Sequence, residues 1–433
     1  MAMELPTLPA FLQCFERGDR YVVVNPLLPS WIVTDALGLN ILSLIGQGTP
    51  RQEIIDIIAS AIGEESRDGT DRFCDLVAAS HLLDTAAPQQ APRDGSLRCV
   101  HLSLSSRCNL SCRYCYAAER RETTERLLTL EQWRTVIDDL CDIAPGITFT
   151  ITGGEPLLNP LWSAVAKHIK DNPRSGRLHL LTNGLLINER NIDTIARYFD
   201  LVTLSIDGST PESHALTRGD NLAQVVKAAD LLERKGIDYT ISMTVTKLNI
   251  DQVEPMARRY GALLNYQPLF PVNGEASESI AISGREYYEV LTGAFGVNPL
   301  GYCEASLDAS RQRQSHKCAI GDNEISISAS GDVYPCQLLH VPEFYAGNVA
   351  EQSVKEIYGK AESLLRCAEL DVNTIEKCAR CAVRYICGGA CRARAYYETG
   401  DIASAGDFCT YEHEALIDGI AKLYSTDALT IDS

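Results

Sequence analysis

The sequence predicts an α/β fold built around a parallel sheet, and three observations support this prediction. Six short apolar segments in the middle of the chain alternate with stretches of helical periodicity, as expected for strands that are joined by helices. Two short strands and three helices are predicted before this region, and a stretch dense in cysteine follows it. A chain of 433 residues is long enough for about two or three domains.

Composition and charge narrow the functional classes. The chain is 45% hydrophobic and 22% charged, as in a globular protein, and its net charge of −18 argues against nucleic acid or an anionic membrane as a partner. No apolar run reaches the roughly 18 residues of a membrane helix, and the N-terminus shows no signal-peptide core, so we expect a cytoplasmic protein. In that reducing compartment the 16 cysteines indicate metal or cluster binding rather than disulfides.

The first predicted unit spans residues 1–88. Thr49 and Gln52 form a capping-box pair with Pro50 at the first helical position, which predicts the start of a helix. The other elements are expected as strands at Tyr21–Val24 and Trp31–Thr34 and as helices from near Asp35 and around Asp71–Leu83. No cluster of residues in this unit suggests chemistry, and the segment 86–95 has the composition of a linker.

Residues 98–302 are predicted to hold the large sheet. Its strands are expected at 99–104, 147–152, 178–182, 201–206, 239–245 and 263–269. Thr129 and Gln132 form a capping box at the start of one intervening helix, and Gly236 stops another that begins at Asn221. The sheet is either open or curled into a partial barrel, and in both folds the site lies at the carboxyl ends of the strands.

Three cysteines, Cys108, Cys112 and Cys115, directly follow the first of these strands. Thiols so close together on one loop can wrap one small inorganic cluster. A 4Fe–4S cluster normally takes four thiolates, so three leave one iron for a distant cysteine or for a substrate. Zinc sites usually pair their ligands as Cys-x2-Cys, so a zinc knuckle fits this spacing less well.

The second strand ends in Gly153, Gly154, Glu155 and Pro156. Paired glycines let a ligand approach the backbone closely, and Glu155 offers a carboxylate at the strand end. An amino-acid ligand on the open iron needs a partner for its ammonium group, and Glu155 with nearby carbonyls can serve. At the end of the strand that follows the cysteine loop, this motif is expected to face the cluster.

The cysteine loop with Tyr114 before its last cysteine, followed by Gly153–Pro156, resembles the radical S-adenosylmethionine (SAM) superfamily. The resemblance implies a partial (β/α)6 barrel of the TIM type and a 4Fe–4S cluster whose fourth iron is chelated by SAM. One electron then cleaves SAM to methionine and a 5′-deoxyadenosyl radical, which abstracts a hydrogen from the substrate. The SAM site implied by the family consists of Tyr114, Gly153, Gly154, Glu155, Asn183, Ser205, Asp207 and Arg218.

The residues alone leave other roles open for three members of this set. Asn183 and Asp207 lie at strand ends, where a turn or a helix cap is a common function of such side chains. A surface salt bridge is as good an explanation for Arg218 as a place in the site.

Seven of the nine cysteines in the last third of the chain, residues 303–425, form a spaced group. They are Cys318, Cys336, Cys378, Cys381, Cys387, Cys391 and Cys409. Four of these, Cys378, Cys381, Cys387 and Cys391, could by themselves bind zinc. A hairpin is predicted between the first two, at Ile325–Tyr334, with its turn near Gly331.

This arrangement resembles the SPASM extension of certain radical SAM enzymes, which implies two auxiliary iron–sulfur clusters, expected as 4Fe–4S. The inner cluster takes Cys318, Cys336 and Cys391 by this resemblance, and the outer one takes Cys378, Cys381, Cys387 and Cys409. The inner cluster then has three clear ligands. Cys303 or Cys367 fills the gap, or the inner site stays open or holds a smaller cluster.

The first unit resembles the PqqD-like winged helix that recognises peptides. In that family a leader peptide adds a strand to the small sheet and lies against a helix. The alternative for this unit is a helical cap with a purely structural role.

Together the three resemblances point to radical SAM/SPASM maturases of ribosomally made peptides. They imply a precursor peptide bound through its leader, a crosslink or another oxidative change in that peptide, and a reductant such as flavodoxin or ferredoxin. No general base can be assigned without the substrate. The alternatives are a sulfatase-type maturase, a tetrapyrrole-modifying enzyme, an iron–sulfur electron-transfer or scaffold protein, and a zinc-binding interaction module.

Overall fold

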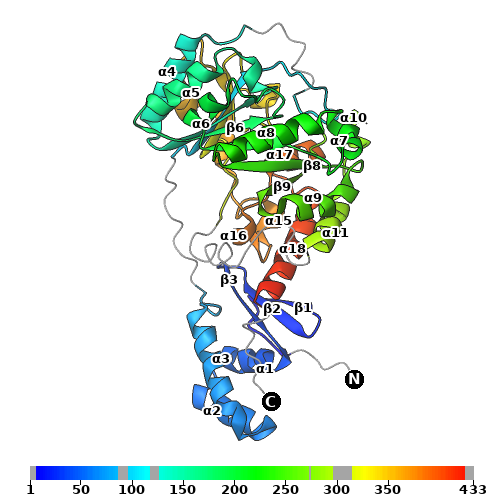
Figure 1. The fold of residues 1–433 in the computed structure, drawn as a ribbon. Coiled ribbons are helices and arrows are strands. Elements are labelled where there is room, and N and C mark those ends of the chain that lie inside the picture. Colours follow the sequence, from blue (N-terminus) through cyan, green and yellow to red (C-terminus); the bar gives the residue numbers. More distant parts are fainter. Residues whose placement is uncertain (1–5, 86–95, 118–125, 273–274, 296–314, 425–433) are drawn as a thin grey trace.

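The computed structural model describes residues 6–85, 96–117, 126–272, 275–295 and 315–424. The large sheet and its helices lie at one end of the molecule, and the N-terminal unit lies at the other (Figure 1). The cysteine-rich part lies between them, so it contacts both.

The N-terminal unit is a three-stranded antiparallel sheet followed by helices. Its elements are β1 (Gln13–Arg17), β2 (Arg20–Asn25), β3 (Ser30–Thr34), α1 (Ala36–Gly46), α2 (Arg51–Ile62), η1 (Glu64–Ser66) and α3 (Arg67–Ala79). β2 and β3 confirm the two predicted strands. β1 is missing from the sequence prediction because Gln13, Glu16 and Arg17 make it too polar to stand out.

Two helix starts in this unit differ from the prediction. The prediction of a capping box at Thr49 and Gln52 is wrong. Pro50 occupies the N-cap position of α2 and makes no side-chain capping hydrogen bond, so Thr49 lies one residue before the cap. α3 begins at Arg67, before the predicted start near Asp71, because the short turn η1 runs directly into it.

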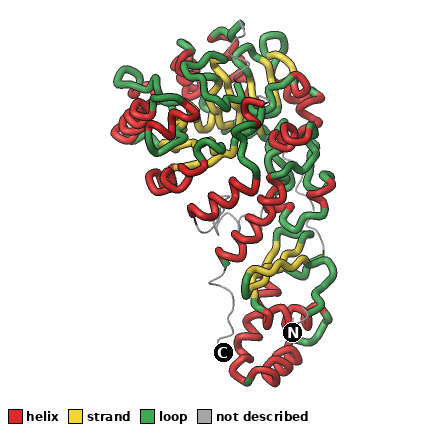
Figure 2. Tube along the Cα trace, turned by 90° about the vertical axis from the view of Figure 1, so that its right-hand side faces the viewer, coloured by secondary structure: helices red, strands yellow, loops and turns green. Residues whose placement is uncertain are grey.

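The small sheet is buried on both faces, because alternate residues of a strand point to opposite sides. Val23 and Ile32 pack against α1, α2 and α3. The other face packs against the cysteine-rich part in a cluster of Val22, Val24, Trp31, Val33, Ala382, Val383, Ile386, Leu416, Ile417, Ile420 and Ala421. Arg17 adds ion pairs to Glu414 and Asp418 of α18 (Phe408–Leu423), the long helix beside the sheet in Figure 1 and Figure 2.

All six predicted strands of the large sheet are present, and they are parallel and in sequence order. They are β4 (Cys99–Ser105), β5 (Ile147–Gly153), β6 (Ser175–Thr182), β7 (Leu201–Ser205), β8 (Tyr239–Val245) and β9 (Leu264–Pro268). The connecting helices are α4 (Leu130–Ile143), η3 (Pro156–Leu158), α5 (Trp162–Asp171), α6 (Ile192–Tyr198), α7 (Pro211–Arg218), α8 (Leu222–Arg234), η4 (Ile250–Gln252), α9 (Val253–Tyr260) and η5 (Gly261–Leu263). The capping box of Thr129 and Gln132 is confirmed at the start of α4.

The sheet has three more strands than predicted. The predicted hairpin forms from β10 (Glu324–Ile327) and β11 (Asp332–Tyr334), with Gly331 at a φ of +96° in the turn, and β12 (Gly347–Asn348) follows. β10 pairs in parallel with β4, so the sheet runs from β12 at one edge to β9 at the other. The cysteine-rich part is thereby joined to the strand that leads into the three-cysteine loop.

The rest of the described chain is helical. α10 (Glu275–Glu278) and α11 (Gly284–Phe295) follow β9. The cysteine-rich part contains η6 (Pro342–Phe344), α13 (Val354–Lys360), α14 (Glu362–Ala368), α15 (Glu376–Ala379), α16 (Arg384–Cys387), α17 (Arg392–Thr399) and α18. No helix in the described ranges is both long and apolar enough to cross a membrane.

The main core lies between the large sheet and its helices. Val100, Leu102 and Leu104 of β4 are almost fully buried there against Trp133 and Ile137 of α4. Each such side chain stabilises the fold by about 1.5–3 kcal/mol. The alternate residues of the strands are less buried and smaller or polar, and their side of the sheet is where the cavity lies.

Candidate active site and cluster sites

A cavity of about 500 Å³ opens at the carboxyl ends of the parallel strands. Strands β5 to β9 each contribute residues to its wall, so the sheet curves around it. The three cysteines of the loop after β4 also line it, as do Gln337 and Leu338 from the cysteine-rich part. Of the residues predicted for the SAM site, those that line the cavity are Tyr114, Gly153, Gly154, Asn183, Ser205 and Arg218. The other two, Glu155 and Asp207, are fully buried behind the wall.

The end of β5 holds the cysteine loop through its backbone. The Gly154 N–H donates to the Ser105 carbonyl at 2.6 Å, and the Glu155 N–H donates to the Arg107 carbonyl at 2.9 Å. A Cβ atom on Gly154 would lie 2.3 Å from the Arg107 oxygen, and one on Gly153, with a φ of +130°, would lie 2.4 Å from the Ser105 oxygen. Both positions therefore need glycine for β5 to approach this loop.

The Glu155 carboxylate fixes the ends of neighbouring elements. Its Oε1 accepts hydrogen bonds from the Thr182 hydroxyl at 2.8 Å and the Leu157 N–H at 3.2 Å. Its Oε2 accepts one from the Asn183 N–H at 2.9 Å. Burial raises the pKa of Glu155 above its ordinary value, and the three hydrogen bonds oppose that rise. The side chain thus sets the position of the β6 end, where Asn183 enters the cavity wall.

Two polar side chains approach the thiols of the loop. Asn183 Nδ2 donates to Asn109 Oδ1 at 2.8 Å and lies 3.8 Å from Cys108 Sγ. Arg218 Nη1 lies 4.0 Å from Cys112 Sγ. N–H groups beside the sulfur atoms tune an iron–sulfur cluster. The loop, with these donors and the adjoining cavity, fits a cluster that leaves room for a ligand.

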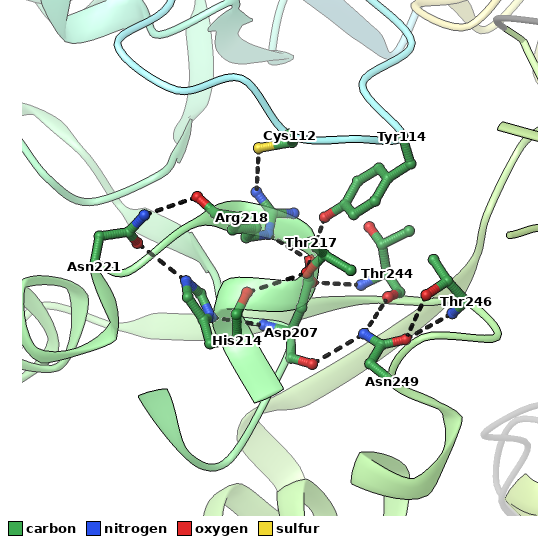
Figure 3. Close-up of polar contacts among 10 residues, drawn as sticks. All are labelled: Cys112, Tyr114, Asp207, His214, Thr217, Arg218, Asn221, Thr244, Thr246 and Asn249. Atoms are coloured by element: carbon green, nitrogen blue, oxygen red, sulfur yellow. Dashed lines mark hydrogen bonds and ion pairs between the residues drawn. The ribbon is translucent and has the colours of Figure 1, made fainter. Parts of the chain in front are cut away.

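Asp207 is the centre of a buried polar network (Figure 3). Its Oδ2 accepts hydrogen bonds from the Tyr114 hydroxyl, from the Thr217 hydroxyl at 2.9 Å and from Arg218 Nε at 2.8 Å. Its Oδ1 accepts one from the Thr244 N–H at 2.9 Å. The Arg218 guanidinium also lies over the Tyr114 ring, 5.4 Å from its centroid. One carboxylate therefore positions two side chains of the cavity wall, Tyr114 and Arg218.

Arg218 brings positive charge to this corner of the cavity. Burial acts to lower its pKa, but Asp207, Tyr114 and Cys112 outweigh burial and raise the pKa above its ordinary value. Burial is the main cause that raises the pKa of Cys112, and Arg218 acts in the opposite direction. A cation in this place favours anionic partners, such as thiolates or the carboxylate of a ligand.

A further set of residues supports the network, and the sequence prediction missed it. His214 Nε2 is 3.0 Å from Asn221 Oδ1, and Asn221 Nδ2 donates to the Arg218 carbonyl at 2.8 Å. Asn249 Nδ2 donates to the Asp207 carbonyl at 2.9 Å. These residues form no spaced motif, and only the fold brings them together.

Gln337 and Leu338 are also absent from the predicted site. They line the cavity because β10 pairs with β4 and places the segment after Cys336 beside the strand ends. Their position directly after a predicted cluster ligand is the one signal in the sequence that could have identified them.

The four cysteines predicted for the outer cluster, Cys378, Cys381, Cys387 and Cys409, line one cavity of about 340 Å³. Backbone N–H groups of Val383 and Gly389 donate to the thiols of Cys381 and Cys387. The shared cavity and these donors fit a cluster with four thiolate ligands.

The three cysteines predicted for the inner cluster lie in one core cluster of the cysteine-rich part. The thiols accept hydrogen bonds from backbone N–H groups: Cys318 from Ile320 and Arg392, Cys336 from Leu338, and Cys391 from Ala393 and Arg394. Three of these donors, on Arg392, Ala393 and Arg394, belong to the first turn of α17, whose N–H groups have no partner within the helix. The setting fits an anionic cluster.

Two cysteines remain from the sequence analysis as possible fourth ligands of the inner cluster. Cys303 lies outside the described residues. Cys367 is 1% exposed and belongs to the same core cluster as the three cysteines predicted for the inner site. Burial is the main cause that raises the pKa of Cys367 to about 12, and the charge of the Cys318 thiolate adds to the rise.

The part of the chain that the structure describes contains no group of ligands suited to a zinc ion. There, no three His, Cys, Asp or Glu side chains lie close enough to hold one metal ion. A cluster of several irons sets its thiolates farther apart than a single tetrahedral ion does.

Two family models match the chain. Residues 102–260 match the radical SAM superfamily, and residues 318–382 match SPASM, an iron–sulfur cluster-binding domain. The first match contains the three-cysteine loop and the polar network around Asp207. The chain therefore has a radical SAM core followed by a SPASM domain, and its cofactors are SAM and iron–sulfur clusters.

Curated relatives of the chain have several activities. One is an AdoMet-dependent heme synthase of Methanosarcina barkeri, 26% identical over 344 residues, which cover 72% of this chain and 96% of the relative. Another is a cysteine-type anaerobic sulfatase-maturating enzyme of Clostridium perfringens, 24% identical over 66% of this chain and 86% of the relative. A third is a PqqA peptide cyclase of Streptomyces rochei, 24% identical over 76% of this chain and 93% of the relative.

Solved structures share the fold at low sequence identity. The structure of native anSMEcpe with bound AdoMet has a TM-score of 0.61 and 21% identity, and the match covers 76% of this chain and 98% of that one. The crystal structure of Streptococcus suis SuiB bound to precursor peptide SuiA has a TM-score of 0.56 and 14% identity, and the match covers 93% of this chain and 98% of that one.

Proposed function

We propose that this radical SAM enzyme, whose core is followed by a SPASM domain, modifies a ribosomally made precursor peptide. The observation that carries the proposal is the place of the N-terminal unit. Its sheet packs against Ala382, Val383 and Ile386, which lie between the outer-cluster cysteines Cys381 and Cys387. A unit that resembles a peptide-binding module is thus built onto the redox part of the enzyme.

SAM occupies the cavity at the strand ends in this proposal. Cys108, Cys112 and Cys115 hold the cluster, and Arg218 faces the SAM carboxylate. The amino group lies against the backbone of Gly153–Glu155, and Tyr114 lies beside the adenine. When bound, the cluster and SAM supply a 5′-deoxyadenosyl radical that removes a hydrogen atom from the substrate.

The remaining candidates hold the ribose and methionine end of SAM. Asn183 and Ser205 line that part of the wall. Asp207 acts from behind it, because its carboxylate fixes Tyr114 and Arg218.

Two groups of cysteines would hold the auxiliary clusters, which would supply a place for the electron that the substrate gives up during oxidation. The inner cluster is held by Cys318, Cys336 and Cys391, next to Gln337 and Leu338 of the cavity wall. The outer cluster is held by Cys378, Cys381, Cys387 and Cys409, farther toward the N-terminal unit. A reductant such as flavodoxin or ferredoxin would supply the electron that the cleavage of SAM needs.

Residues 1–88 form the leader-docking domain, 98–302 the radical SAM core and 303–425 the SPASM domain in this proposal. A groove of about 300 Å³ between α1, α2 and α3 is the place for the leader. Its wall includes Ile45, Ile54, Val77 and Ala78, and Leu76 on the same helix is 38% exposed. Such a groove accepts apolar side chains of an extended or helical peptide.

The comparisons support a peptide substrate in two ways. Peptide-modifying enzymes are among the relatives, including the PqqA peptide cyclase and the sulfatase-maturating enzyme. The match to SuiB covers 93% of this chain, against 76% for anSMEcpe, and the difference is close to the length of the N-terminal unit. SuiB was crystallised with its precursor peptide.

Tetrapyrrole modification is the second candidate. The 26% identity to the AdoMet-dependent heme synthase over 344 residues favours it. A tetrapyrrole enzyme has no evident use for a peptide-docking unit, which is why we place this candidate second. A pure electron carrier would not need a polar cavity beside its cluster.

The production of 5′-deoxyadenosine separates the two candidates. The anaerobic enzyme is mixed with SAM and dithionite, and the rate is followed by liquid chromatography without substrate, with a tetrapyrrole, or with the peptide of a small open reading frame encoded beside this one. We expect the peptide alone to increase the rate. An increase with the tetrapyrrole and none with the peptide would reverse the order of the candidates.

A further inference from the structure

The polar side chains in the two halves of the cavity wall differ in how they are used. In the half around the cysteine loop, Asn183 donates to Asn109 and Arg218 donates to Asp207. The other half carries three amide side chains, which belong to Asn265, Gln267 and Gln337. Within the part of the chain that the structure describes, these three amides have no hydrogen-bond partner. Their donors and acceptors are therefore available to a ligand.

We propose that Asn265, Gln267 and Gln337 bind main-chain amide groups of the peptide substrate, next to the residue that is modified. The proposal rests on the proposed function, because it takes a peptide to be the substrate. It assigns the half of the cavity that the predicted SAM residues leave free.

β9 presents two of the amides to the cavity. Asn265 and Gln267 are two residues apart on this strand, so their side chains leave it on the same face. They pair with Ser242 and Thr244 of β8, which line the same cavity. Both amides are exposed, and β9 is an edge strand of the sheet.

Helix α17 brings Gln337 to the same part of the cavity. The Tyr397 hydroxyl donates to the Leu338 carbonyl at 2.6 Å, and Arg394 Nη2 donates to the Pro268 carbonyl at 2.9 Å. Arg394 and Tyr397 are three positions apart, so they are neighbours on one face of the helix. α17 thus ties the residue after Gln337 to the end of β9.

This half of the wall is neutral, although Arg394 lies behind it. The Arg394 guanidinium is held between the rings of Phe270 and Phe408, at 4.2 and 4.0 Å from their centroids, and donates to main-chain carbonyls of the wall. Among the described residues that line the cavity, Arg218 is the one Arg, Lys, Asp or Glu, and Asp207 pairs with it.

A neutral group of amides matches a peptide main chain. Each amide side chain has a carbonyl acceptor and N–H donors, which are the groups that a peptide bond also carries. Phe270 and Leu338 supply apolar surface around them, and a few polar groups in an apolar wall are what orients a ligand. Carboxylates, such as those of a tetrapyrrole, would instead need cations to replace the water that they lose on binding.

The test is a thermodynamic cycle between one side chain and one main-chain group. Mass spectrometry of the peptide of the neighbouring small open reading frame first locates the modified residue. Synthetic peptides of that sequence then carry an N-methyl group on the main-chain nitrogen before, at or after this residue. KM and kcat of the reconstituted full chain are measured for the wild type, Gln267→Met and Gln337→Met. Gln224→Met, at an exposed position of α8 outside the cavity wall, is the control.

We expect at least one N-methyl group to raise the peptide KM of the wild type about tenfold, because it removes a main-chain donor. The same group should raise KM less than about twofold in Gln267→Met or Gln337→Met, where its partner is already missing, while the control responds like the wild type. Asn265→Leu replaces either Met variant in the cycle if that variant loses iron.

Two different results would overturn the proposal. N-methyl effects that are absent, or equal in all the enzymes, overturn it alone, because the peptide is still modified. A wild type that cleaves SAM but modifies no peptide overturns the proposed function together with it.

Discussion

Single residues at the end of β5 decide whether the cysteine loop is placed correctly. Gly154 touches the Arg107 carbonyl, so its replacement must move either β5 or the loop. We expect Gly154→Ala to lose about four irons per chain after anaerobic reconstitution, because the loop no longer holds its cluster. Gly359 in α13 has open space around it, and Gly359→Ala should keep the full iron content. Full iron in both variants would contradict this account of the glycine pair.

The buried Glu155 gives a second prediction, because its pKa is raised by burial above the ordinary value of 4.5. A carboxyl group with a raised pKa in the folded state contributes stability below its unfolded pKa and loses it as the pH rises through the folded pKa. The free energy of unfolding of the wild type, minus that of Glu155→Gln, should therefore fall as the pH increases from about 4.5. Chemical denaturation at several pH values measures it, and a difference that grows with pH would show that the three hydrogen bonds outweigh burial.

At the scale of elements, the groove between α1, α2 and α3 is the proposed leader site. Ala78 is exposed and lines this groove, whereas Ala79 is exposed and lies outside its wall. We expect Ala78→Trp to fill the groove and to weaken binding of a precursor peptide by about tenfold or more, which corresponds to about 1.4 kcal/mol. Fluorescence anisotropy with a labelled peptide measures the affinity, and Ala79→Trp is the control. Equal affinities for both variants would show that the leader does not bind in this groove.

Elements with a strong local pattern could be predicted from the sequence. The six parallel strands and the helix starting at Thr129 have clear apolar periodicity and a working cap, and the structure confirms them. β1 could not be predicted because most of its residues are polar. The start of α2 could not be predicted because Thr49 and Pro50 offer two adjacent cap positions.

Structural features that depend on contacts between distant residues could not be predicted from the sequence. The hairpin was expected, but its pairing with β4 joins residues more than two hundred positions apart, and no local signal encodes that. The same holds for the network around Asp207. The family resemblance placed Asp207 and Arg218 in the site, whereas the roles of His214 and Asn249 became visible only in the folded chain.

At the scale of the whole molecule, the N-terminal unit and the cysteine-rich part are packed together through one apolar cluster. Trp31 is fully buried against α18 and the outer-cluster loop, and Cys381 and Cys387 pack against the same cluster of residues. Removal of the whole unit would expose this apolar face, so point variants test leader binding more cleanly than a truncation does.

This packing predicts that the interface supports the outer cluster. Trp31→Ala should destabilise the protein by about 3–5 kcal/mol and release about four irons, because the loop between Cys381 and Cys387 loses its support. Ile32→Ala, on the opposite face of the same strand, destabilises the N-terminal helices but should keep the irons. Iron analysis and thermal unfolding measure both effects, and equal iron loss in the two variants would argue against a specific role of the interface.

The central claim is that the radical chemistry of this chain is directed at a peptide. The most direct measurement is mass spectrometry of the peptide of the neighbouring small open reading frame after anaerobic co-expression, with the wild type and with Cys112→Ala. We predict a modified peptide with the wild type alone, and a loss of two hydrogens would identify a crosslink. A peptide that is unchanged in mass and chirality, under conditions in which the wild type cleaves SAM and converts a tetrapyrrole, would contradict the claim.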